Sequence, residues 1–115
     1  MNKLNMLFAT ALLSLSALCS PLALAADKIW IDVRSVEEFQ AGHLEGAVNI
    51  VHTDIAAKIA TVTQDKNAEI QLYCRSGRRS GLAEAELKKL GFTNVHNAGG
   101  YEALKAAAEK GGKPG

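Results

Sequence analysis

The pattern of apolar and polar positions predicts short strands that alternate with helices along most of the chain. Short runs rich in apolar or β-branched residues predict strands over 29–33, 47–51, 70–74 and 94–97. Apolar residues at helical spacing and helix start and stop signals predict helices over 36–41, 53–61, 78–90 and 101–110. This alternation, repeated four times with short connections, indicates an α/β fold. We expect a parallel sheet of four to five strands flanked by helices.

Residues that begin and end helices support this division. Ser35 precedes the first predicted helix and Glu38 follows three residues later, which is the arrangement of a capping box. Thr53 can cap the second helix, and Gly91 follows the third at the position where glycine often ends a helix. The side chains of the last two helices that we expect in the core are Leu82, Ala83, Leu87, Leu90, Tyr101 and Leu104.

The first 25 residues are predicted to be a signal peptide. Lys3 provides a positive start, an uncharged leucine-rich stretch follows, and Ala23-Leu24-Ala25 places small residues where signal peptidase cleaves. A membrane anchor needs about 20 apolar residues in a row, and serines and a proline interrupt this stretch earlier. We expect export, cleavage after Ala25 or Ala26, and no membrane contact afterwards. The folded domain is expected over 26–112 and a disordered tail over 113–115.

Composition limits the size of the domain and its partners. The chain has 115 residues, 48% of them hydrophobic, and a formal net charge of +1, which fits one domain. A near-neutral chain with 5% aromatic residues lacks the basic surface and the stacking platforms of a nucleic-acid binder. Two cysteines exclude a scaffold built on several disulfides. Because Cys19 lies in the predicted signal peptide, the exported form keeps Cys74 as its one thiol.

A lone cysteine is most often an inert core residue, but the segment that follows Cys74 indicates a nucleophile. It joins a predicted strand to the start of a helix, where unpaired backbone N–H groups favour an anion. Small residues let the chain curl around a guest, and three guanidinium groups add permanent positive charge. These features are expected to lower the pKa of the thiol from about 8.5. The segment comprises Cys74, Arg75, Ser76, Gly77, Arg78, Arg79, Ser80 and Gly81.

The length of this loop separates two reaction classes, phosphoryl transfer through a phosphocysteine and sulfur transfer through a persulfide. Cysteine-dependent phosphatases have five residues between the cysteine and an arginine that closes a ring around the phosphate oxygens. Here Ser80 occupies the arginine's position, and Arg79 comes one residue earlier. A shorter ring suits a single sulfane sulfur better than a whole phosphate, so the spacing favours sulfur transfer.

Three segments, in order along the chain, carry a resemblance to a known family. The first segment comprises Asp32-Val33-Arg34, Glu38-Phe39 and residues 42–50. The second is the six-residue loop from Cys74 to Arg79, and the third is Asn97-Ala98-Gly99-Gly100-Tyr101. In this combination the chain resembles the single-domain rhodaneses, in particular the periplasmic phage-shock-protein-E type of thiosulfate sulfurtransferase. Leu104 departs from the pattern, since many members have tryptophan there. The resemblance implies a small rhodanese-like domain in the periplasm, with no metal and no organic cofactor.

The resemblance also implies a mechanism. Cys74 would attack the outer sulfur of thiosulfate, release sulfite and hold the sulfur as a persulfide, which a thiophilic acceptor such as cyanide or a thiol then collects. Amide groups of the loop would stabilise the persulfide anion. The residues expected to bind the substrate are Arg75, Ser76, Gly77, Arg78, Arg79 and Ser80.

Asp32 and Arg34 end the first predicted strand and are expected to support the site from the same edge of the sheet. We interpret them as an ion pair or a loop brace. Two alternatives to this enzyme stay open: a rhodanese-like module that binds without catalysis, and an arsenate reductase or phosphatase-like enzyme on a similar scaffold. The acceptor stays open between a small thiol and a protein cysteine, and the sequence indicates no oligomeric state.

Overall fold

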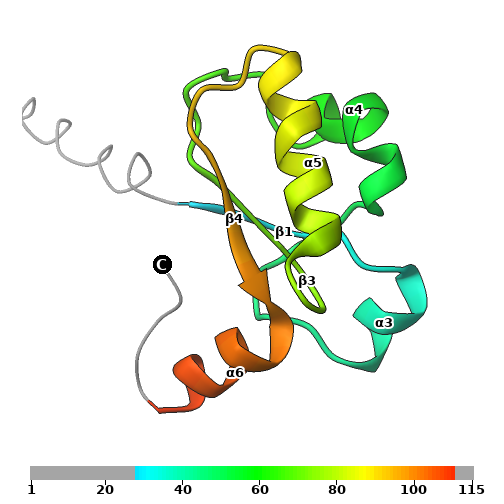
Figure 1. Ribbon diagram of the computed structural model, residues 1–115, viewed down its shortest axis with the longest axis vertical. Coiled ribbons are helices and arrows are strands. Elements are labelled where there is room, and N and C mark those ends of the chain that lie inside the picture. Colours follow the sequence, from blue (N-terminus) through cyan, green and yellow to red (C-terminus); the bar gives the residue numbers. More distant parts are fainter. Residues whose placement is uncertain (1–27, 111–115) are drawn as a thin grey trace, which may run out of the picture.

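The computed structural model describes residues 28–110 and contains a four-stranded sheet (Figure 1). Its strands are β1 (Ile29–Asp32), β2 (Val48–Asn49), β3 (Ile70–Cys74) and β4 (Val95–Gly100). They lie in the order β2-β1-β3-β4, and all neighbours run parallel. The predicted α/β class and parallel sheet are confirmed. The predicted signal peptide and the tail over 113–115 lie outside the described residues.

Helices follow the strands and cover the sheet. Their bounds are α3 (Val36–Ala41), α4 (Ile55–Lys58), α5 (Arg78–Lys89) and α6 (Tyr101–Glu109). α5 packs along β3 and β4 and against α4, whereas α3 and α6 lie near the ends of the strands, low in Figure 1. That end is the carboxyl edge of the sheet, where open α/β proteins bind their ligands. Among residues 28–110, no helix has both the length and the apolar character needed to cross a bilayer.

The core lies between the two central strands and the helices α4 and α5. Ile31 of β1 and Leu72 of β3 are opposite each other in the sheet, and both are fully buried. Ile55 of α4 and Leu87 of α5 cover them from one face. Cys74 belongs to the same cluster at its carboxyl edge, so the packed core fixes the position of its backbone.

The segment predicted as one helix over 53–61 is a short helix between two 3-10 turns, η2 (His52–Asp54) and η3 (Ile59–Thr61). Thr53 lies inside the first turn and makes no capping hydrogen bond. At the other end, the Thr61 hydroxyl donates to the Lys58 carbonyl oxygen at 2.7 Å. The segment is therefore helical over the predicted length, but it is α-helical only over Ile55–Lys58.

Of the four side chains predicted to face the core from the helix over 78–90, two are buried and two are exposed. Ala83 and Leu87 are fully buried, whereas the side chains of Leu82 and Leu90 are among the large exposed apolar groups, at 49% and 42%. Leu82 directly precedes Ala83, so it lies about 100° away around the helix. Tyr101 and Leu104 are half-buried rather than in the core, because α6 contacts mainly the last strand.

The predicted helix ends at Ser35 and Gly91 are confirmed. The Ser35 hydroxyl accepts the Glu38 N–H at 3.1 Å, and the Glu38 carboxylate accepts the Ser35 N–H at 2.9 Å, which completes the capping box of α3. Gly91 follows α5 with a φ of 100°, a conformation that glycine adopts without strain.

Candidate active site

Cys74 ends β3 at the carboxyl edge of the sheet, and the loop 75–77 leads from it into α5. Gly77 turns the chain into the helix with a φ of 97°, which is unfavourable for any residue with a β-carbon. The loop passes over the cysteine, and no part of Cys74 is exposed to solvent. The atoms that surround the sulfur are those of the loop and of the first turn of α5.

The sulfur of Cys74 accepts hydrogen bonds from the loop that covers it. The Gly77 N–H donates to Sγ at 2.9 Å, and the Ser80 hydroxyl lies 3.5 Å from Sγ. Burial raises the pKa of the thiol, but hydrogen bonds from the Ser80 hydroxyl and from the amides of Ser80, Ser76 and Gly77 outweigh it and lower the pKa overall. The direction agrees with the prediction, and the hydrogen bonds favour the thiolate that a nucleophile needs.

The three arginines of the loop have different surroundings. Arg79 donates to both carboxylate oxygens of Glu38, at 2.8 Å and 3.1 Å, and so ties the first turn of α5 to α3. The same bond lowers the pKa of Glu38 to about 2. Arg75 and Arg78 are exposed and form no ion pair with any residue in 28–110. These two guanidinium groups are thus the ones available to an incoming anion.

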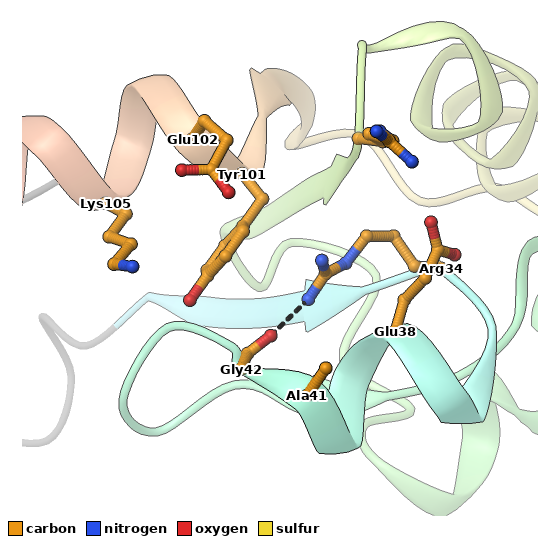
Figure 2. Close-up of a pocket in the computed structure, with 8 residues that line it drawn as sticks. Arg34, Glu38, Ala41, Gly42, Tyr101, Glu102 and Lys105 are labelled. Atoms are coloured by element: carbon orange, nitrogen blue, oxygen red, sulfur yellow. Dashed lines mark hydrogen bonds between the residues drawn. The ribbon is translucent and has the colours of Figure 1, made fainter.

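Asp32 and Arg34 form a buried ion pair, which is one of the two interpretations that the sequence suggested. Arg34 Nε donates to Asp32 Oδ1 at 2.9 Å, and Arg34 Nη2 lies 2.6 Å from Asp32 Oδ2. Nη2 also donates to the Gly42 carbonyl oxygen (Figure 2), and the guanidinium lies 4.4 Å from the ring centroid of Tyr101. The pair thereby joins the end of β1 to the end of α3 and the start of α6.

Asn97 is a site residue that the sequence reasoning missed. Its Oδ1 accepts the Ser80 hydroxyl at 2.6 Å and the Gly99 N–H at 3.0 Å, and its Nδ2 donates to the Gly77 carbonyl oxygen at 2.9 Å. Asn97 thus holds both residues that contact Sγ, and the single proton of the Ser80 hydroxyl is shared between Asn97 and Cys74. The signal in the sequence was a polar residue two positions before the pair Gly99-Gly100, within the strand that lies next to β3.

A bulge in β4 brings this strand against the loop. Leu72 is opposite Asn97 but Tyr73 is opposite Gly99, so Ala98 is an extra residue on β4. Gly100 then comes so close to the loop that an added β-carbon would lie 2.5 Å from the carbonyl oxygen of Arg75. A glycine is therefore required at position 100.

We expect the substitution Asn97→Ala to slow the reaction of Cys74 with iodoacetamide about tenfold at neutral pH, because the Gly77 amide is no longer held against the sulfur. The midpoint of the rate against pH should move upward if the Gly77 N–H, which Asn97 holds through the Gly77 carbonyl oxygen, is the donor that decides the pKa of the thiol. His96→Ala is the matched control, because His96 is exposed on the same strand and bonds only to Asn94. An unchanged midpoint in Asn97→Ala would show that Asn97 does not position the loop.

Among the described residues, Cys74 is the candidate reactive group, and no cluster of side chains suggests a metal centre beside it. Within 28–110 no group of three or more His, Cys, Asp or Glu side chains is arranged to hold a metal ion. Ser76 is exposed on the loop, whereas Ser80 is fully buried against the sulfur. The arrangement can accept an electrophilic atom on Sγ and stabilise negative charge there through backbone N–H groups.

Comparisons with known proteins agree with this geometry. The model of the rhodanese-like domain family matches residues 20–107. The thiosulfate sulfurtransferase PspE of Escherichia coli (strain K12) is 40% identical over 105 residues, covering 91% of this chain and 100% of that protein.

Solved structures give the same result. A rhodanese with anions from E. coli is 43% identical, with a TM-score of 0.64 over 66% of this chain and 89% of that chain. A human single-domain sulfurtransferase is 25% identical, with a TM-score of 0.62 over 83% of this chain and 92% of that chain. Because the family model matches most of the chain and a 40% identical relative is matched along its whole length, this chain belongs to the rhodanese-like domain family.

Proposed function

We propose that this protein is a thiosulfate sulfurtransferase that carries sulfane sulfur on Cys74. The observation that supports this most directly is the geometry at Cys74, whose sulfur accepts the Gly77 N–H at 2.9 Å and lies 3.5 Å from the Ser80 hydroxyl, contacts that lower the pKa of the thiol. The relative PspE, which this chain matches over the full length of that protein, is a thiosulfate sulfurtransferase. The presence of the cysteine disfavours the alternative of a module that binds without catalysis.

The reaction has two halves. The Cys74 thiolate attacks the outer sulfur of thiosulfate, the S–S bond of thiosulfate breaks, and sulfite leaves with the electron pair. A thiophilic acceptor then attacks the outer sulfur of the persulfide, and the electron pair of that S–S bond returns to Cys74. The Gly77 N–H and the Ser80 hydroxyl, which lie within reach of Sγ, stabilise negative charge on the sulfur in both halves.

The substrate anion is proposed to bind at the rim of the loop. Arg75, Arg78 and Ser76 are exposed there, so their donors can reach the sulfite group of thiosulfate. Arg79 is occupied by Glu38 and Ser80 is buried, so we assign Arg79 to holding α5 and Ser80 to the sulfur itself. One of the relatives, the E. coli rhodanese, was solved with anions, which is consistent with a loop built for them.

Export is part of this proposal. The charged start, the leucine-rich stretch and the alanines at 23 and 25 are typical of a cleaved signal peptide. We propose that residues 1–25 are removed and that the domain over 26–112 acts in the periplasm.

Mass spectrometry of the protein after incubation with thiosulfate tests the proposal. We expect the mass of one added sulfur atom, which cyanide then removes as thiocyanate. A binding module would show no added sulfur. A phosphatase-like enzyme would instead hydrolyse a phosphate ester and leave the protein without sulfur, and either result would contradict the proposal.

A further inference from the structure

A pocket of about 300 Å³ lies beside the Cys74 loop, between α3 and α6. Figure 2 shows Tyr101, Glu102 and Lys105 on α6, and Ala41 and Gly42 at the end of α3, with Arg34 between the two helices. Arg34 follows β1, Arg75 follows β3 and Tyr101 follows β4. The pocket is thus at the carboxyl edge of the sheet, where ligands of open α/β sheets bind.

The pocket adjoins the loop that follows the reactive cysteine. Arg75, which lines it, is the residue after Cys74, and the backbone of Gly100 packs against the carbonyl group of Arg75. The start of α6 is therefore held next to the loop that covers the sulfur. A molecule bound in the pocket lies beside the same loop whose Gly77 N–H donates to Sγ.

The charges that line the pocket divide into two groups. Arg34 is neutralised by Asp32, and Glu38 by Arg79. Arg75, Glu102 and Lys105 form no ion pair with any residue in 28–110. The pocket therefore offers a ligand two cations, Arg75 and Lys105, and one anion, Glu102.

We propose that this pocket binds the sulfur acceptor, and that the acceptor is a small thiol with both a carboxylate and an ammonium group, such as a free amino-acid or short-peptide thiol. The proposal rests on the sulfurtransferase function stated above. The ligand's carboxylate pairs with Lys105 and Arg75, and its ammonium group pairs with Glu102. A pocket of this size suits a small molecule rather than a protein surface.

The donor fits this pocket less well than the acceptor. Thiosulfate is a compact dianion with no cationic group, so it has no partner for Glu102 and leaves much of the volume empty. In the acceptor half, the ligand's thiolate attacks the outer sulfur of the Cys74 persulfide, having lost its proton to water. The S–S bond of the enzyme persulfide breaks, the electron pair returns to Cys74, and the ligand leaves as a persulfide.

The test uses the persulfide form of the protein and four small thiols. L-cysteine carries both charges, 3-mercaptopropionate only the carboxylate, cysteamine only the ammonium group, and 2-mercaptoethanol neither. The rate of sulfur transfer is measured for wild type and variant, and the ratio for each thiol cancels differences in intrinsic nucleophilicity. The variants are Lys105→Ala and Glu102→Gln, and Lys89→Ala is the matched control on the far end of α5.

We expect Lys105→Ala to lower kcat/KM about fivefold for the two thiols with a carboxylate, and Glu102→Gln to do so for the two with an ammonium group. 2-Mercaptoethanol and cyanide should show no such dependence, and Lys89→Ala should match wild type with every acceptor. Equal losses with all four thiols, or none with L-cysteine, would overturn the proposal.

Measuring the first half of the reaction, in which thiosulfate forms the Cys74 persulfide, distinguishes a failure of this proposal from a failure of the sulfurtransferase function. If Lys105→Ala slows persulfide formation from thiosulfate as much as it slows transfer to L-cysteine, the pocket holds the donor and the assignment is wrong. If wild type takes up no sulfur from thiosulfate at all, the sulfurtransferase function itself fails. Because the two halves are followed by mass separately, these outcomes are distinct.

Discussion

Cys74→Ser is expected to abolish sulfur transfer from thiosulfate to cyanide, with a loss of about a thousandfold or more. A hydroxyl at this position has a far higher pKa than a thiol, so the loop hydrogen bonds cannot hold it ionised at neutral pH. It also cannot form the S–S bond on which both halves of the reaction depend. Steady-state turnover and the mass of the thiosulfate-treated protein give the result.

The second cysteine of the chain provides the control for this substitution. Cys19→Ser in the full-length chain leaves Cys74 in place and should keep both turnover and sulfur uptake. A thermal melt should show that Cys74→Ser remains folded, because the oxygen can still accept the Gly77 N–H that the sulfur accepts. Retained turnover in Cys74→Ser would place the nucleophile elsewhere.

Local patterns in the sequence predict most of the fold. The alternation of strands and helices depends on neighbouring residues, and so do the capping box at Ser35 and the glycine end at Gly91. The place of Cys74 at the end of β3 follows from the same pattern, since a strand that leads directly into a helix fixes the loop between them. The helix predicted over 53–61 is α-helical only over Ile55–Lys58, between two 3-10 turns, and the spacing of apolar residues does not distinguish these two kinds of helix.

The partners of the site residues could not be predicted in this way, because they come from distant parts of the chain. Arg79 and Glu38 are 41 positions apart, and Ser80 and Asn97 are 17 apart. Spacing along the chain carries no information on such pairs until the order of the strands is known. With β4 next to β3, Asn97 comes beside the loop, and its amide becomes part of the site.

Asp32→Asn is expected to destabilise the fold by about 3–5 kcal/mol, the second large effect. The substitution keeps the size of the side chain but removes its charge, which leaves the Arg34 guanidinium buried without a counter-ion. The Asp32 carboxylate accepts hydrogen bonds from the Arg34 side chain and its backbone N–H, and the asparagine amide cannot accept them all. Urea unfolding monitored by circular dichroism measures the loss.

The exposed ion pair between Lys58 and Asp54 is the matched control, since its side chains are 61% and 48% exposed. Asp54→Asn should change the free energy of unfolding by about 1 kcal/mol or less, because water already solvates both charges. The contrast between the two substitutions isolates the cost of burying an unpaired charge. An equally small effect of Asp32→Asn would mean that Arg34 reaches solvent, and then it could not fix the end of β1 against Gly42 and Tyr101 beside the site.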